Sequence, residues 1–253
     1  MTQSDATKQI FRQIVPPRYR GAIRSYAARA AHFGTRRFCP CCNSHVRQFG
    51  PYGEQPRSDA MCPVCGALER HRLSAMFLNR RHELLAGLKR VLHVAPEPPV
   101  ERVLRRWTQE SYISIDLSED NVLVQGDLTG MPFRSQSFDA IYCSHVLEHV
   151  PDDMKAMNEL RRVLRPGGWA IIQVPITRQA TFEDTSITDP ERRRQLFGQR
   201  DHVRVYGYDF PDRLARARFS VSIERPQTGL GRKTMTRCGL NTKENIFFCT
   251  KAH

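Results

Sequence analysis

Residues 91–175 alternate between short apolar runs and one helical pattern, and this alternation limits the folds open to the chain more than any other feature. The apolar runs cover 91–94, 111–116, 138–145 and 169–174, and the helical pattern contains Leu147, Met157, Leu160, Val163 and Leu164 before Pro166-Gly-Gly168. Strands that alternate with helices pair in parallel, with helices packed on the sheet. Ligands of such sheets bind at the carboxyl ends of the strands. The sequence therefore predicts an α/β fold with a binding site at that edge.

Polar residues follow these runs where a nucleoside cofactor would bind. Asp116 ends the second run, Asp127 follows a short apolar stretch, and Ser144 with His145 ends the run that begins at Phe138. A carboxylate at the end of the second strand can accept hydrogen bonds from ribose hydroxyls. We therefore predict that Asp116 binds a ribose.

The same segment resembles the core of class I S-adenosylmethionine (SAM)-dependent methyltransferases over about residues 88–175. The matching stretches are Ile115-Asp116, Gly126-Asp127, Met131-Pro-Phe133 before Ser137-Phe-Asp139, Ser144-His-Val-Leu-Glu-His149 and Leu164-Arg-Pro-Gly-Gly168. The resemblance implies a Rossmann-like parallel sheet with helices on both faces. It also implies an antiparallel last strand, formed by a hairpin of residues 219–223 and 245–250. SAM is the implied cofactor and methyl transfer the implied activity.

The resemblance further implies which residues bind SAM. Asp127 would accept a hydrogen bond from the adenine amino group, Leu128 would pack near the ring, and Ser144 and His145 would lie beside the sulfonium. The full expected set is His93, Ala95, Glu97, Asp116, Leu117, Asp127, Leu128, Ser144 and His145.

The first loop departs from the family pattern. Where the resembling enzymes have an acidic residue and a glycine-rich turn, this chain has His93-Val-Ala-Pro-Glu-Pro-Pro99. Glycine allows close approach of the backbone to a ligand, whereas proline removes an amide donor and stiffens the path. We expect Glu97 to supply the missing carboxylate and bind the cofactor ammonium. The alternative is a degenerate cofactor site.

Five of the eight cysteines lie within residues 39–65. Cys39-Pro-Cys-Cys42 and Cys62-Pro-Val-Cys65 form two C-x2-C pairs, separated by 19 residues. Two such pairs place four thiolates around one tetrahedral zinc ion, and four protein ligands make the ion structural. We predict Cys39, Cys42, Cys62 and Cys65 as the ligands, with Cys41 as an alternative to Cys42. The remaining cysteines (Cys143, Cys238 and Cys249) fit buried positions in the core.

The positive charge is concentrated in the first third of the chain. Residues 1–90 contain 16 Lys and Arg against 5 Asp and Glu, whereas residues 91–253 contain 23 against 21. A basic surface of this kind binds nucleic acid, anionic headgroups or phosphorylated substrates, or remains solvated.

We expect three regions, namely a basic helical extension (1–37), a four-cysteine zinc-binding module with a linking helix (38–87) and the methyltransferase domain (88–253). The extension contains a helix over 19–33 that Gly34 closes, and the linking helix covers 68–88. Residues 50–53 have the composition of a loop. Residues 176–208 are long for a plain connection, so we interpret them as a substrate loop or lid.

Three residues are candidates for proton transfer: His202, His149 and Glu148. Histidine titrates near neutral pH, which suits a general base. We expect Glu148 and His149 to begin the helix after the fourth strand. Alternation in the stretch 202–206 would place Arg204 and Tyr206 on one face with His202, and we expect these two residues to bind the substrate.

The leading hypothesis is methyl transfer to a small molecule or biosynthetic intermediate, at oxygen. No Asn-Pro-Pro-Tyr-like run follows the fourth strand, and Cys143 and Cys249 lack the context of a nucleophile. These absences argue against DNA bases as acceptors. The first alternative is an RNA methyltransferase whose basic, zinc-bearing third docks RNA. The second is a catalytically silent zinc-containing scaffold.

The sequence contains no apolar run of the roughly 20 residues that a membrane helix needs. The N-terminus lacks the apolar core of a signal peptide. We therefore expect a cytoplasmic protein without a membrane span, and the sequence leaves the oligomeric state open.

Overall fold

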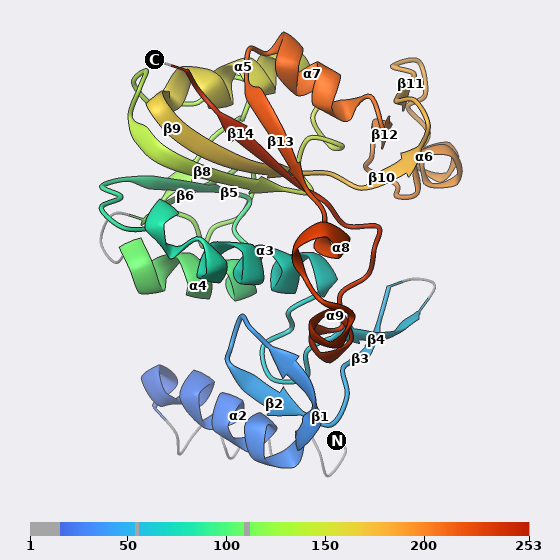
Figure 1. Ribbon diagram of the computed structural model, residues 1–253. Helices are drawn as coiled ribbons and strands as arrows, with labels where there is room; N and C mark the ends of the chain where they lie inside the picture. Colours follow the sequence, from blue (N-terminus) through green and yellow to red (C-terminus); the bar gives the residue numbers. More distant parts are fainter. Residues whose placement is uncertain (1–15, 54–55, 109–111, 253) are drawn as a thin grey trace.

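The computed structural model describes residues 16–53, 56–108 and 112–252, so residues 1–15 of the predicted extension lie outside the described part. The strands of the central sheet are β5 (Val91–Val94), β6 (Tyr112–Asp116), β7 (Val124–Gln125), β8 (Phe138–Ser144), β9 (Leu164–Gln173), β13 (Ser220–Glu224) and β14 (Ile246–Thr250). Their order is β13-β14-β9-β8-β5-β6-β7 (Figure 1). β14 runs antiparallel to both β9 and β13. The predicted Rossmann-like sheet with an antiparallel last strand is confirmed.

Helices cover both faces of this sheet (Figure 1). They are α3 (Glu69–Arg80) and α4 (Pro98–Thr108) on one face, and α5 (Asp153–Val163) and α7 (Phe210–Arg216) on the other. Consecutive residues of a strand point to opposite faces. Accordingly Ile171 packs in one buried cluster with Leu104 of α4, and Ile172 packs in another with Leu160 and Leu214. Burial on both faces explains why the strands read as continuous apolar runs.

The helix after β8 begins later than predicted. Asp152 caps α5 by accepting a hydrogen bond from the amide of Lys155 at 2.9 Å, and the helix proper starts at Asp153. Glu148 and His149 therefore lie in a turn, and the prediction that they begin the helix is wrong. This turn follows the carboxyl end of β8.

The N-terminal part consists of a helix and two antiparallel hairpins. Its elements are α2 (Pro17–Ala31), β1 (Phe33–Cys39), β2 (Ser44–Val46), β3 (Gly50–Tyr52) and β4 (Arg57–Met61). The expected loop at 50–53 is thus largely strand, because it pairs with β4. Gly34 lies inside β1 and does not close α2. A Cβ at Gly34 would lie 2.8 Å from the Cα of Arg47, so this position needs glycine for close approach of the chain.

The linking helix is shorter than predicted. α3 ends at Arg80, and a short 3₁₀ helix, η1 (His82–Leu84), follows it. Gly87 has φ +75°, a left-handed conformation that a helix cannot contain. α3 packs beside α4 against the central sheet. The predicted domain boundary at 87/88, which assigns α3 to the zinc-binding module, remains a proposal.

A segment near the C-terminus reaches back to the hairpins (Figure 1). It contains α8 (Pro226–Gly229) and α9 (Arg232–Cys238), between β13 and β14. Arg72 of α3 connects this segment with the hairpins. Its Nε donates to the carbonyl of Cys238 at 2.6 Å. Its Nη1 donates to the carbonyls of Ala60 at 2.7 Å and Ala67 at 2.6 Å. Arg72 is fully buried and lies over the ring of Phe49.

Residues 176–208, interpreted from the sequence as a substrate loop or lid, contain regular structure. The elements are β10 (Ile176–Arg178), β11 (Phe182–Glu183), α6 (Pro190–Phe197) and β12 (Arg204–Gly207). β12 lies between β10 and β11 in a small sheet beyond the end of β9 (Figure 1). Within the described ranges, no helix combines the length and apolar character needed to cross a membrane.

Candidate functional site

Most of the residues predicted to bind the cofactor gather at one edge of the central sheet. β5, β6, β7 and β8 are parallel, and Val94 at the end of β5 pairs with both Ile115 and Cys143. Asp116 and Ser144 directly follow those two partners. The carboxyl ends of all four strands therefore meet at the same edge.

Asp116 and Asp127 each use one carboxylate oxygen to hold a turn. Oδ1 of Asp116 accepts from the amides of Ser118 at 2.9 Å and Glu119 at 3.0 Å. Oδ1 of Asp127 accepts from the amide of Thr129 at 2.7 Å. These bonds fix the direction of each carboxylate, and the second oxygen of each is available to a ligand.

Apolar residues follow both carboxylates. Leu117 is 73% exposed, and Leu128 is 6% exposed. Leu117 follows Asp116, the carboxylate predicted to bind the ribose, and its exposed side chain is a surface on which an adenine ring can pack. The placement agrees with the roles that the resemblance implies, without testing them.

Two residues at this edge other than glycine adopt left-handed backbone conformations. Ala95 has φ +47° and His145 has φ +56°. This conformation costs an L-residue roughly 1–2 kcal/mol, and such strain collects at functional sites. The turn after β5 therefore has a backbone shape for which glycine is suited, although the chain has alanine there.

The prolines of the first loop have a different role from the one expected. Pro98 and Pro99 are the first two residues of α4, where a helix does not need their amides. The carbonyl of Glu97 accepts from the amides of Val100 at 3.0 Å and Glu101 at 2.9 Å. The prolines thus start a helix directly after the turn.

Glu97 is held by two residues of α3 that the sequence analysis missed. Its Oε1 forms an ion pair with Arg70 and lies 2.7 Å from Nε2 of His71. Burial alone would raise the pKa of Glu97, but the hydrogen bond from His71 and the charge of Arg70 outweigh it and set this pKa to about 2. In the sequence, only the charged residues at the start of α3 indicated this contact, because Arg70 and Glu97 lie 27 residues apart along the chain.

His93, predicted to bind SAM, has its side chain in the core of the sheet. The side chain is fully buried, with Nδ1 2.8 Å from the hydroxyl of Tyr112 and the ring edge-on to Tyr142. Burial lowers the pKa of His93 to about 3. It is a neutral core histidine, because β5 is covered on both faces.

Several buried polar atoms at this edge have no hydrogen-bond partner in the described structure. They include Oε2 of Glu97, Oγ of Ser144 and Nε2 of His145. Buried polar atoms nearly always have partners, so an unpartnered group calls for an explanation such as a ligand. Acceptors of this kind fit the charged methionine end of SAM, which presents an ammonium group.

The three predicted catalytic residues lie together. One ligand-type atom from each of Glu148, His149 and His202 lies within 4.8 Å of the others. The rings of His149 and His202 meet edge to face with centroids 4.6 Å apart. Burial lowers the pKa of His202. The cluster joins the turn after β8 to the segment before β12.

Arg204 and Tyr206, predicted to bind substrate, are both buried and bonded to other parts of the chain. Arg204 is 2% exposed, and its Nε donates to Glu183 at 2.9 Å. Its other nitrogens donate to the carbonyls of Leu147, Val150 and Pro151. The hydroxyl of Tyr206 donates to Asp153 at 2.8 Å. Alternation had suggested a surface strand, but the whole of β12 is buried.

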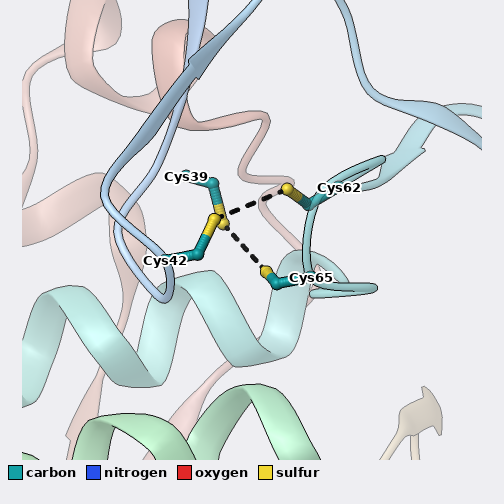
Figure 2. A group of neighbouring side chains, drawn as sticks. All are labelled: Cys39, Cys42, Cys62 and Cys65. Carbon is teal, nitrogen blue, oxygen red and sulfur yellow. Dashed lines mark hydrogen bonds between the residues drawn. The ribbon is translucent and has the colours of Figure 1, made fainter. Parts of the chain in front are cut away.

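A second cluster contains the four predicted zinc ligands (Figure 2). Sγ of Cys39 lies 3.6 Å from Sγ of Cys65, and Sγ of Cys42 lies 3.9 Å from Sγ of Cys62. A tetrahedral zinc ion with Zn–S bonds of about 2.3 Å places its sulfurs about 3.75 Å apart. The cluster therefore fits zinc, and hydrogen bonding with Cys39 raises the pKa of Cys65 when no ion is present.

The backbone around the cluster explains which cysteine of the first pair takes part. Asn43 (φ +53°) and Gly66 (φ +74°) follow the second cysteine of each pair and turn the chain back. Cys42, and not Cys41, belongs to the group of four. Cys143, Cys238 and Cys249 are buried, as predicted.

Two cavities lie away from these clusters. One of about 320 Å³ lies between α3 and the segment around Pro226, and one of about 530 Å³ is lined by Arg161, Arg218 and Lys251. The cofactor site is therefore located by strand ends and unpartnered atoms, and not by cavity shape.

Comparison with known sequences finds similarity to one family over part of the chain. Residues 79–172 match the methyltransferase domain family. A sterol 4-C-methyltransferase of Caenorhabditis elegans is 35% identical over 63 residues, which are 25% of this chain and 19% of that protein. A demethylmenaquinone methyltransferase of Staphylococcus epidermidis is 42% identical over 53 residues, or 21% of this chain and 22% of that protein. The chain thus spans about a fifth of the length of these curated relatives.

Solved structures share the fold at low sequence identity. A SAM-dependent methyltransferase from Mesorhizobium loti has a TM-score of 0.51 at 14% identity, covering 70% of this chain and 96% of that one. The [4+2]-cyclase SpnF has a TM-score of 0.53 at 16% identity, covering 82% and 88%. Residues 79–172 therefore match the methyltransferase domain family, within a chain that shares its Rossmann-like fold with these structures.

Proposed function

We propose that this protein is a SAM-dependent methyltransferase that acts on an oxygen of a small-molecule acceptor. One observation carries the proposal: Asp116 and Asp127 lie at the ends of neighbouring strands, at the edge where Glu97 and Ser144 keep buried atoms unpartnered. This edge belongs largely to the segment that matches the methyltransferase domain family. The names of the relatives refer to sterols and demethylmenaquinone, which supports a small-molecule acceptor.

The cofactor site is assembled from four strand ends. Asp116 would bind the ribose hydroxyls, Asp127 the adenine amino group, and Leu117 and Leu128 the faces of the ring. Glu97 would bind the ammonium group through Oε2, because Oε1 is already paired with Arg70 and His71. The bound cofactor supplies an activated methyl group on sulfur.

The acceptor would lie near Glu148, His149 and His202. With the cofactor bound, its methyl group would pass to the acceptor oxygen and the bonding electrons would stay on sulfur, while these residues would orient the acceptor. The acceptor proton leaves to a basic atom nearby. Nδ1 of His202 donates to the carbonyl of Phe197 at 3.0 Å, so Nε2 keeps a lone pair that can receive this proton.

Calorimetry with SAM tests the cofactor site. We expect micromolar binding to the native chain and a loss of about 10- to 150-fold in Asp116→Ala, because a hydrogen bond to a charged group contributes about 1.5–3 kcal/mol. Glu97→Ala should also weaken binding, and Glu119→Gln, an exposed neighbour, should not. Absence of SAM binding would leave only the scaffold alternative, since a fold alone does not fix a reaction. Unchanged affinity in Glu97→Ala would refute its role.

A second candidate, methylation of RNA, is supported by the surface of the N-terminal part. Tyr26 on α2 is 77% exposed and Phe33 on β1 is 65% exposed, beside an arginine-rich helix. Exposed aromatic rings near positive charge can stack on bases. This pattern was not evident from the sequence, which showed no obvious stacking platform.

Salt titration of single-stranded RNA binding tests this second candidate. We expect affinity to fall steeply with ionic strength if RNA docks here. Tyr26→Ala should then weaken binding about 5- to 150-fold, because stacking contributes about 1–3 kcal/mol per base. Tyr208→Ala, a similarly exposed tyrosine outside the basic third, is the control. A flat salt response would exclude RNA docking.

We also propose that the four-cysteine cluster holds one structural zinc ion. The sulfur spacing and the paired turns support it. Four thiolates leave no open position, so the ion would stabilise the hairpins and take no part in methyl transfer.

A further inference from the structure

The cluster of Glu148, His149 and His202 has the composition of a metal site as well as of a catalytic base. One ligand-type atom from each residue lies within 4.8 Å of the others. Two ligands of one ion lie at most about 4.2 Å apart, because the bonds to nitrogen or oxygen are about 2.1 Å long. Side-chain rotations that move the ligand atoms by roughly half an ångström would bring them within the range for one ion.

Both histidines are already oriented to offer the same ring nitrogen. Nδ1 of His202 donates to the carbonyl of Phe197 at 3.0 Å, and Nδ1 of His149 donates to Asp201 at 3.0 Å. In each ring the proton on Nδ1 leaves the lone pair on Nε2. An outer carboxylate or carbonyl that fixes the tautomer in this way is typical of metal-binding histidines.

The third residue provides a buried carboxylate with one oxygen to spare. Glu148 is 1% exposed, and its Oε1 lies 3.3 Å from Nδ1 of His145. Its Oε2 is buried without a hydrogen-bond partner, and so is Nε2 of His202. Buried polar atoms are rarely left unpartnered, and an ion would satisfy both.

The two segments that carry these residues are held rigidly together. The amide of Val203 donates to the carbonyl of Glu148 at 2.9 Å. The guanidinium of Arg204 donates to the carbonyls of Leu147 at 2.8 Å and Pro151 at 2.7 Å. Arg204 thus braces the turn after β8, which keeps the donor atoms in place.

We propose that Glu148, His149 and His202 bind a divalent first-row transition ion, such as Mn²⁺, Fe²⁺ or Zn²⁺. Two imidazole nitrogens and one carboxylate oxygen suit these ions, whereas Mg²⁺ and Ca²⁺ prefer oxygen ligands alone. Three protein ligands leave positions for water or for an acceptor oxygen. The binding of the ion does not rest on the proposed function. With the ion bound, Nε2 of His202 is a ligand, so its role as a base applies only to the chain without the ion.

The test separates this site from the four-cysteine cluster. With the thiolate site filled by zinc, Mn²⁺ is added and the free ion is counted by electron paramagnetic resonance; hard Mn²⁺ has little affinity for thiolates. In parallel, calorimetry follows the uptake of further Zn²⁺. We expect one additional ion per chain.

Variants assign the ligands. Loss of a ligand in His149→Gln or His202→Gln should weaken the additional ion at least about 100-fold, and Asp201→Asn about 10-fold, because outer partners contribute 10- to 100-fold. His149 is partly exposed, so its variant should fold even if the buried ones do not. His82→Gln, an exposed histidine, is the matched control.

Absence of an additional ion in both measurements overturns the proposal, and so does binding that survives His149→Gln and His202→Gln unchanged. SAM calorimetry on the same preparation keeps the two proposals apart. An ion without SAM binding would remove methyl transfer and keep the metal site. SAM binding without an additional ion would remove the metal site and keep the proposed methyl transfer.

Discussion

At the scale of single residues, His93 shows how burial changes the chemistry of a side chain. The sequence offers it at the end of the first strand, where the resembling enzymes have an acid. In the structure it is enclosed by Tyr112 and Tyr142, and burial lowers its pKa to about 3. An unfolded histidine has a pKa of about 6.5. This difference connects His93 to the stability of the fold at acid pH.

The sign of that connection follows from proton uptake. Below pH 6.5 the unfolded chain gains a proton on His93 that the folded chain does not, so the free energy of unfolding falls as the pH falls toward 3. We expect His93 to account for a loss of about 2 kcal/mol between pH 7 and pH 5. Urea unfolding of His93→Gln should show a flatter pH dependence in this window. His82→Gln should keep the native slope, and an unchanged slope in His93→Gln would contradict the burial argument.

At the scale of elements, Arg72 fastens three parts of the chain that are distant in sequence. Its hydrogen bonds reach the carbonyls of Ala60, Ala67 and Cys238, while Nη2 donates to Gly239 at 2.8 Å. Burial lowers the pKa of this guanidinium, and the four carbonyls offset the burial of its charge. This side chain thus contacts the hairpins and the end of α9 from its position on α3.

Replacement of Arg72 by lysine keeps the charge and removes the fork of donors. We expect Arg72→Lys to lower the free energy of unfolding by about 3–5 kcal/mol, the range for breaking a buried charged contact. Urea unfolding measures it. The exposed Arg102 of α4 provides the control, since Arg102→Lys should stay within about 0.5 kcal/mol of the native chain. Equal free energies of unfolding for the two variants would mean that Arg72 does not hold these elements together.

At the scale of the whole molecule, the N-terminal part is too small to be stable by strand pairing alone. Its two hairpins are two-stranded sheets, with strands as short as three residues. Isolated two-stranded hairpins are marginal in water. An ion in the four-cysteine cluster would contribute on the order of 10 kcal/mol to folding of this part. The central sheet has its own core on both faces.

Removal of the ion with a strong chelator should therefore make residues 33–67 sensitive to protease while the central sheet stays folded. The four-cysteine site can be followed by substitution with Co²⁺, whose thiolate charge-transfer absorption distinguishes it from a site of nitrogen and oxygen ligands. Cys65→Ser should abolish this absorption. Cys41→Ser should retain it, because Cys41 lies outside the group of four. The opposite result would exchange the roles of Cys41 and Cys42.

The sequence pattern located six of the seven strands of the main sheet, because most of these runs are apolar along their length. It showed β7 only as a short apolar stretch, and it assigned Leu164, the first residue of β9, to the preceding helix. It failed for residues 176–208, whose short strands are joined by ion pairs such as Arg204 with Glu183 at 2.9 Å. Charged residues in a polar stretch resemble a loop until their partners are known. For the same reason the sequence did not reveal that Arg204 and Tyr206 are buried.

The sequence by itself determined the parallel sheet and the grouping of carboxylates at one edge, because these depend on local apolar pattern and on parallel pairing. The antiparallel last strand was implied by the resemblance to the methyltransferase family. The sequence also specified the spacing of the four cysteines. Only the tertiary structure decided that Glu97 pairs with α3, that His93 is buried, and that His149 and His202 meet. Those contacts join residues from separate elements, and their energies depend on burial and on partners that no local pattern contains.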